Sequence, residues 1–299
     1  MRHALVFGGS RQIGRTLLAR LHRRGWQVIA VSRHAQTAMP GVRWLRGELG
    51  GVDGLPSRVD AIFSCGPLDG FARWYARSTI DCPRVVAFGS TSIEVKREST
   101  DAAERDVAAR LREGEAGVLA AASARGAAAT LLRPTLVYGA ASDRSLTRIA
   151  AIAARWGRFA LPRDAAGLRQ PVHVEDLALA AFAVIDASVT HGRAYALPGG
   201  ETLPYRDMVA RVLAVLQPPA KLHLLPPAAF RMLLALAHAG GAARDFGDAA
   251  LARMREDLVF DAGPARRDFG YAPRAFEPDV GMFAPRGASG AGSDVDRPR

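Results

Sequence analysis

A glycine-rich turn close to the N-terminus constrains the fold more than any other part of the chain. The apolar run His3–Phe7 ends in two glycines, and a helical pattern follows over Gln12–Arg24. This order of strand, turn and helix is typical of a dinucleotide-binding unit, because the helix dipole and the free N–H groups at its start attract a pyrophosphate. Gly8 permits the turn, and Gly14 lets the helix pack closely; a glycine turn without a ligand is the alternative. The predicted cofactor contacts here are Gly8, Gly9, Ser10, Arg11, Gln12, Ile13 and Gly14.

Two arginines favour NADP as the cofactor. Arg11 stands where a GxxGxxG pattern has its middle glycine, and its guanidinium is placed to lie over a phosphate. Arg33 follows the predicted strand Gln27–Ser32. An acidic residue near this position binds the ribose hydroxyl of NAD, whereas an arginine accommodates the 2′-phosphate of NADP. We therefore predict NADP, with NAD as the alternative; the competing interpretation of Arg33 is an ordinary surface arginine.

Three further residues are predicted to complete the cofactor site. Glu48 is the one acidic residue placed to meet the adenine edge. An equally good interpretation is that Glu48 is a solvated residue of a turn. Cys65 and Gly66 stand at the end of the predicted strand Asp60–Cys65, where ligands bind in an open parallel sheet.

Short apolar runs alternate with helical patterns through the first half of the chain, which predicts βαβ units and a parallel sheet. Further strands are predicted at Val42–Arg46, Arg84–Phe88, Thr130–Arg133 and Arg193–Leu197, and helices at 102–125, 146–156 and 175–187. We predict a dinucleotide-binding domain over residues 1–140 and about 170–198. Residues of about 141–169 and 199–283 form a mostly helical substrate lobe, and 284–299 a disordered tail.

Composition limits the class of protein. The net charge is +11, and all but Lys96 and Lys221 of the 40 Lys and Arg residues are arginines. They are spread along the whole chain, so we predict no nucleic-acid partner. Two cysteines without a CxxC pattern and histidines without metal-ligand spacing predict a reducing, cytoplasmic location and no metal site. The strand at the N-terminus leaves no room for a signal peptide, and the apolar stretch at 230–243 is too short for a membrane span.

The glycine turn and four further motifs, in order, resemble those of the extended and atypical short-chain dehydrogenase/reductases, particularly the NAD-dependent epimerase/dehydratase-like proteins. The glycine turn is followed by VVAFGSTS at 85–92, by LRPTLVYG at 132–139 and by QPVHVEDLA at 170–178, and GYAP stands at 270–273. The second motif is similar to the family's strand with an active-site Ser or Thr, and the next two are similar to its RPxxxYG and VHVxDLA segments. The resemblance extends over roughly residues 3–280.

The resemblance implies an α/β fold, a Rossmann-type doubly wound parallel sheet of about seven strands with a small C-terminal substrate lobe. It implies a small-molecule substrate, with a nucleotide sugar as one class, and a homodimer formed through the long helices of the sheet's outer face. The family's chemistry depends on a Tyr-x-x-x-Lys pair, in which the lysine lowers the tyrosine pKa. No such pair occurs in this sequence.

Three interpretations of that absence remain open. The protein binds NADP without chemistry, as a regulatory or assembly protein; or it reduces a substrate activated by other groups; or Tyr138 replaces the missing acid. Ser90 and Ser92 are predicted to line the active site, with turn chemistry as the alternative. His173 is predicted on the substrate side, although a buried structural histidine is equally in keeping with its valine neighbours. We predict an NAD(P)-dependent oxidoreductase or epimerase-like enzyme; a non-catalytic NADP-binding protein is the rival.

Overall fold

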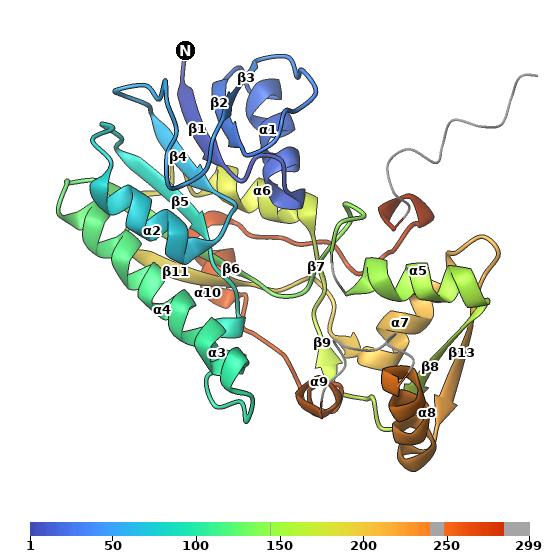
Figure 1. Ribbon diagram of the computed structural model, residues 1–299. Helices are drawn as coiled ribbons and strands as arrows, with labels where there is room; N and C mark the ends of the chain where they lie inside the picture. The colour runs from blue at the N-terminus through green and yellow to red at the C-terminus, as the bar shows by residue number, and fades with distance from the viewer. Residues whose placement is uncertain (144, 240–247, 284–299) are drawn as a thin grey trace, which may run out of the picture.

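A seven-stranded parallel sheet forms the centre of the protein (Figure 1). The computed structural model describes residues 1–143, 145–239 and 248–283, so the predicted tail lies outside the described residues. The strand order is β11-β6-β5-β4-β1-β2-β3. These strands are β1 (His3–Phe7), β2 (Gln27–Ser32), β3 (Val42–Arg46), β4 (Ala61–Ser64), β5 (Arg84–Phe88), β6 (Ala128–Pro134) and β11 (Arg193–Leu197). The predicted Rossmann-type sheet is confirmed.

Helices cover both faces of the sheet, which is why β4 and β5 are buried along their whole length. One face carries α1 (Gln12–Arg23) and α6 (Val174–Ala183), and the other carries α2 (Leu68–Arg77) and α4 (Ala102–Ser123). The strand order reverses between β1 and β4. On one side of this point β1 is followed in the sheet by β2 and β3, and on the other side β4 is followed by β5 and β6. Such a reversal opens a crevice beyond the carboxyl ends of the strands, where ligands bind in open α/β sheets.

The sequence analysis did not predict α2. Leu68, Phe71, Ala72 and Tyr75 are its buried residues, at the i, i+3, i+4, i+7 spacing of an amphipathic helix. Phe71 stacks on Tyr75 with ring centroids 5.8 Å apart. Gly70 and three aromatic side chains give this segment low intrinsic helix propensity, and packing against the sheet compensates for it.

A separate apolar cluster lies outside the central sheet and draws only on residues from Tyr138 onward. Its main elements are α5 (Leu146–Trp156), β8 (Arg158–Pro162), α7 (Tyr205–Ala214), β13 (Lys221–Leu225), α8 (Pro227–Ala239) and α9 (Asp248–Arg253). We call these elements the C-terminal lobe. The parallel pair of β8 and β13 adds strands to a lobe that the sequence analysis expected to be mostly helical.

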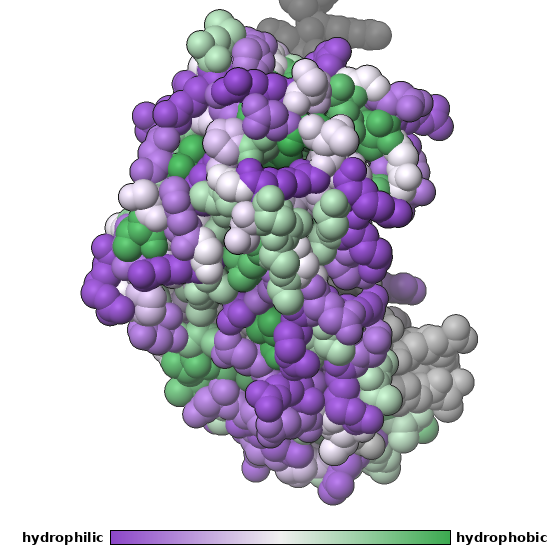
Figure 2. Space-filling view, turned by 90° about the vertical axis from the view of Figure 1, so that its left-hand side faces the viewer, coloured by the Kyte–Doolittle hydropathy of each residue, from purple (hydrophilic) through white to green (hydrophobic). Residues whose placement is uncertain are grey.

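The remaining elements are short. They are α3 (Ser92–Val95), β7 (Val137–Tyr138), β9 (Leu168–Arg169), β10 (Val172–His173), β12 (Leu203–Pro204) and α10 (Gly263–Phe269), with 3-10 turns at Ser188–Thr190 and Val280–Met282. Among the described residues, no helix has both the length and the hydropathy that crossing a membrane requires. On the side of the molecule that carries α2 and α4, hydrophilic residues predominate and strongly hydrophobic ones are scattered (Figure 2).

Candidate cofactor and active site

The turn between β1 and α1 leaves no space for side chains at two of its glycines. Gly8 has a φ of +72°, and a Cβ there would lie 2.7 Å from the carbonyl carbon of Cys65. A Cβ on Gly14 would lie 2.2 Å from the carbonyl oxygen of Gly8. The start of α1 is therefore pressed against the turn itself, and the backbone of the turn remains bare for a ligand.

The first turn of α1 is suited to an anion. Arg11 is its N-cap residue with extended backbone, and its side chain makes no capping hydrogen bond. The first turn contains no acidic residue, so no carboxylate competes for the positive end of the helix dipole. The side-chain oxygen of Gln12 is buried and has no hydrogen-bond partner among the described residues.

A cavity of about 460 Å³ lies at the carboxyl ends of β1, β2, β3 and β4. Six of the predicted cofactor residues line it: Gly8, Ser10, Arg11, Arg33, Glu48 and Gly66. The other lining residues, which the sequence analysis did not single out, are Phe7, Val31, Ser32, His34, Gly47, Leu49, Gly50 and Pro67. Their position in the chain could have identified them, because each lies in the last two residues of one of the four strands or in the four residues that follow it.

The remaining predicted cofactor residues do not line this cavity. Gly9, Ile13 and Gly14 are buried, and Gln12 is half-buried beside them. Cys65 is also buried, and burial raises the pKa of its thiol to about 12. At neutral pH this cysteine is a protonated packing residue, and its backbone N–H donates to the carbonyl oxygen of Phe7.

The charge around the cavity is positive. Arg11 and Arg33 both line it with exposed side chains, and Glu48 is its one acidic lining residue. Neither guanidinium has an ionic partner in the part of the chain that the structure describes. Two unpaired arginines beside a bare backbone turn leave this end of the sheet ready to receive a polyanion.

The segment after β5 carries the two predicted active-site serines. The Ser90 hydroxyl donates to Ser92 Oγ over 3.0 Å, and the backbone N–H of Ser92 donates to Ser90 Oγ over 3.1 Å. Both residues are half-buried. The intervening Thr91 is buried and donates to the carbonyl oxygen of Pro134, so it fixes the segment to the end of β6.

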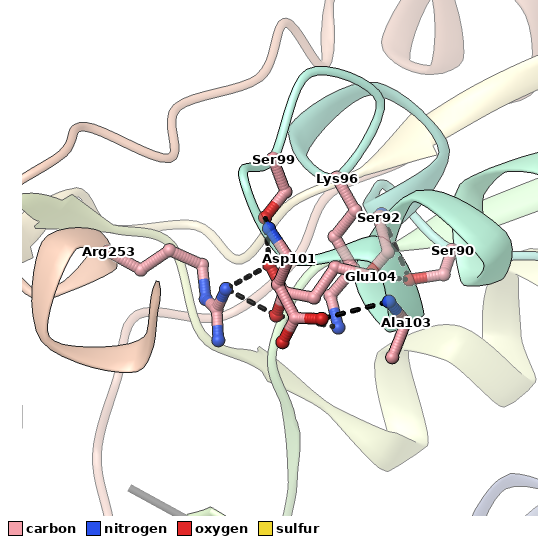
Figure 3. Close-up of polar contacts among 8 residues, drawn as sticks. All are labelled: Ser90, Ser92, Lys96, Ser99, Asp101, Ala103, Glu104 and Arg253. Carbon is pink, nitrogen blue, oxygen red and sulfur yellow. Dashed lines mark hydrogen bonds and ion pairs between the residues drawn. The ribbon is translucent and has the colours of Figure 1, made fainter. Parts of the chain in front are cut away.

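An acidic residue that the sequence analysis did not single out holds this region together (Figure 3). Glu104 of α4 is buried; its carboxylate accepts from the Ser99 hydroxyl over 2.8 Å and lies 3.4 Å from Lys96 Nζ. Arg253, the last residue of α9, forms an ion pair with the same carboxylate. Burial acts to raise the pKa of Glu104, but the Ser99 hydrogen bond and the charges of Arg253 and Lys96 outweigh burial and lower it.

A second ion pair fixes the other side of the serine segment. Arg133 of β6 donates through Nε to Glu115 of α4 over 2.8 Å, and its Nη1 reaches Glu94 of α3 at 3.1 Å. The hydrogen bond with Glu115 is the main cause that raises the pKa of Arg133. The arginine of the LRPTLVYG motif thus ties α3, and with it Ser92, to the sheet.

Tyr138 and His173 lie in a buried junction. Tyr138 is fully buried, and its ring meets His173 and Phe276 edge-on at centroid distances of 5.1 and 4.9 Å. Burial raises the pKa of Tyr138 to about 12. A buried phenol with a raised pKa is better suited to packing than to the role of a catalytic acid.

His173 is the N-cap of α6, because its Nδ1 accepts from the backbone N–H of Glu175 over 3.3 Å. Burial lowers its pKa, so the ring is neutral at physiological pH. Glu175 and Asp176 are the acidic residues of the first turn of this helix. Asp176 accepts from both the backbone N–H and Nε of Arg274, at 3.0 Å each.

Comparisons with known proteins agree with this geometry. Residues 96–197 match the profile of the NAD dependent epimerase/dehydratase family. The chain is 28% identical over 313 residues to the 2-alkyl-3-oxoalkanoate reductase of Stenotrophomonas maltophilia, covering 90% of this chain and 94% of that protein.

Solved structures share the fold at low sequence identity. The epimerase Mth375 of Methanothermobacter thermautotrophicus superposes with a TM-score of 0.72 at 15% identity, covering 94% of this chain and 90% of that one. The Bordetella bronchiseptica enzyme WbmF in complex with NAD+ and UDP gives 0.68 at 17% identity, with the same two coverages. The chain thus shares the fold of these epimerase-like structures, and its residues 96–197 match the NAD dependent epimerase/dehydratase family, in agreement with the motif resemblance.

Proposed function

We propose that this protein is an NADP(H)-dependent reductase that acts on a ketone without a Tyr-x-x-x-Lys pair. The observation that carries the proposal is the cavity at the ends of β1 to β4, lined by the glycine turn and by two arginines without ionic partners. A dinucleotide fits the donors present, because the bare turn and the start of α1 suit a pyrophosphate. Arg33, supported by Arg11, suits the additional phosphate of NADP.

The proposed division of labour follows the sheet. Residues 1–140 with about 170–198 hold the cofactor, and the C-terminal lobe encloses the substrate. Bound NADPH supplies the hydride that the reduction of a ketone requires. Ser90 and Ser92 donate hydrogen bonds to the ketone oxygen and stabilise the charge that develops on it. Water delivers the proton that the alkoxide takes up, since Tyr138 is buried in the lobe's apolar cluster.

The similarity to the 2-alkyl-3-oxoalkanoate reductase of Stenotrophomonas maltophilia supports a reductase, and the name of that protein suggests a 3-oxo acid as the substrate class. A nucleotide sugar is the second candidate substrate, because the WbmF structure of the same fold holds UDP. The two candidate substrates differ in the group that the lobe must recognise. A 3-oxo acid presents a carboxylate with alkyl chains, whereas a nucleotide sugar presents a nucleoside diphosphate.

Calorimetric titration with NADPH and NADH tests the cofactor assignment. Arg33→Ala is expected to weaken NADPH binding about tenfold to 150-fold, the value of a charge-assisted phosphate contact, and to leave NADH binding unchanged. Arg112→Ala, an exposed change on α4, is the matched control and keeps both affinities. If neither dinucleotide binds the wild type, the proposal is wrong.

Turnover measurements distinguish an NADPH-dependent enzyme from a non-catalytic NADP-binding protein. Oxidation of NADPH in the presence of a 2-alkyl-3-oxo acid supports the reductase, and turnover of UDP-sugars alone supports an epimerase-type substrate. Tight NADPH binding without turnover on either panel favours the non-catalytic NADP-binding protein.

A further inference from the structure

A second cavity, of about 1270 Å³, lies in the C-terminal lobe between α5, β8, β13 and α8. Its lining shares no residue with the cofactor cavity. Most lining side chains are apolar: Ala151, Ile152, Trp156, Phe159, Ala160, Leu161, Leu225, Phe230, Leu233, Leu234 and Met254. The rest are basic: Arg148, Arg155, Arg158 and His223. None of the described residues that line the cavity carries a carboxylate, so this lining combines apolar walls with basic side chains.

The positive charge is concentrated where α5 ends and the two strands begin. Arg158 is the first residue of β8 and stands directly opposite Lys221, the first residue of β13, in the parallel register. Like charges in such a position repel each other. Arg155 lies one turn earlier, where the C-terminal end of α5 also favours a cation. Within the described ranges none of these three has an acidic partner, so an anion would relieve their repulsion.

The surface around the cavity is unusually apolar. Five of the nine large hydrophobic side chains that are exposed in the described part of the chain come from the end of α5, from β13 and from α8. Trp156 is 64% exposed, and Met232 and Leu236 are each 66% exposed. Exposed apolar side chains that surround one cavity are more typical of a binding site for an apolar ligand than of an ordinary solvent-exposed surface.

We propose that this cavity binds the alkyl chain of an amphiphilic carboxylate, with the carboxylate held by Arg155, Arg158 and Lys221. The apolar walls remove the chain from water, and the three cations provide the charge that a fatty-acid head group needs. The cavity is separate from the cofactor cavity, because the two share no lining residue. It lies in the lobe proposed to enclose the substrate, so this proposal rests on the proposed function and narrows its substrate class to an amphiphilic carboxylate. The ligand is a free long-chain carboxylate rather than a bilayer, because the apolar lining extends inward from the surface to the buried Leu161.

Contact quenching of Trp156 tests the site directly. Dibromostearate, whose bromine atoms quench indole fluorescence on contact, is expected to quench the wild type. Unbrominated stearate, with the same chain length, is expected to compete without quenching. In Trp156→Phe the dibromostearate response should fall to the level of the other three tryptophans. Equal quenching in wild type and Trp156→Phe would overturn the proposal, because the probe would then bind elsewhere.

Two variants probe the head-group and chain parts separately. Arg158→Glu converts an attraction into a repulsion and should weaken stearate binding about fivefold, with Arg112→Glu on α4 as the charge-matched control. Ala160→Trp fills the cavity and should abolish binding. NADPH affinity is expected to stay unchanged in all three, which separates this proposal from the cofactor assignment and shows that each variant is folded.

Vesicles distinguish a free ligand from a membrane surface. Quenching by phosphatidylglycerol vesicles that carry brominated acyl chains, together with no response to monomeric dibromostearate, would overturn the proposal in favour of surface docking. A response to monomeric dibromostearate that Ala160→Trp removes supports it.

Discussion

Gly14 lies so close to Gly8 that a Cβ at residue 14 would stand 2.2 Å from the Gly8 carbonyl oxygen. A side chain at this position has to push the start of α1 away from the turn. The N–H groups at the helix start are the donors proposed for the pyrophosphate, so the packing of one glycine on another sets the geometry of the whole cofactor site.

Replacing that glycine tests the packing. Gly14→Ala is expected to destabilise the fold by about 1–3 kcal/mol, as overpacking does, and to weaken dinucleotide binding at least about tenfold. Thermal unfolding and calorimetric titration measure the two effects. Gly51→Ala is the control, because a Cβ there meets nothing within 4 Å. Undiminished NADPH binding by Gly14→Ala would mean that the helix start is not the phosphate site.

Ser90 is expected to contribute to turnover and not to cofactor binding. Ser90→Ala removes a donor proposed for the ketone oxygen, which should lower kcat about 100-fold to 1000-fold. Thr91→Val is the matched control, since Thr91 donates to the Pro134 carbonyl oxygen and its loss should cost about 1 kcal/mol of stability but little activity. Steady-state kinetics of both variants measure these effects. Full activity in Ser90→Ala would contradict the proposed contact between Ser90 and the ketone oxygen.

Tyr138 is expected to be dispensable for chemistry. Tyr138→Phe keeps the ring contacts with His173 and Phe276 and removes only a buried hydroxyl. We expect an unchanged kcat and a free energy of unfolding within about 1 kcal/mol of the wild type. A loss of turnover with unchanged NADPH binding would instead identify Tyr138 as the acid.

The lowered pKa of Glu104 predicts acid sensitivity. Its carboxylate has a lower pKa in the folded protein than its ordinary value of 4.5, so folding favours the ionised form. The resulting stabilisation is complete above pH 4.5 and is lost as the pH falls through the lowered pKa.

Urea unfolding of wild type and Glu104→Gln from neutral pH to well below pH 4.5 measures this contribution. The stability difference between the two should be largest near neutrality and should shrink on acidification. Arg253→Met should reproduce part of the loss, because it removes one of the cations that lower the pKa of Glu104. A stability difference that does not change with pH would contradict the assignment.

The sheet could be predicted closely from the sequence. β1, β2, β3, β5 and β11 have the predicted bounds, because each is a short apolar run that ends at a polar or glycine-containing segment. The residues that line the cofactor cavity follow from the same property, since strand ends converge at one edge of a parallel sheet.

Pairings between distant segments could not be predicted. The register that sets Arg158 opposite Lys221 depends on two short strands far apart in the chain. β8 has no alternating pattern, and β13 alternates polar and apolar residues over four positions only. The pairing of Glu104 with Arg253 likewise joins two helices whose own sequences give no sign of each other. The motif at 85–92 draws attention to Ser90 and Ser92, whose role in the site stays a prediction, but it gives no sign of the contacts that hold this segment.

The Glu104–Arg253 pair has a consequence for the order of events during synthesis. Its two residues are 149 positions apart, so a nascent chain on the ribosome has already released the whole parallel sheet before Arg253 emerges. Until then the carboxylate beside Ser99 and Lys96 has only its local partners. The region around Ser99 and Lys96 thus acquires its final ion-pair partner from a helix that is translated late, which delays the completion of this region until the polypeptide is nearly finished.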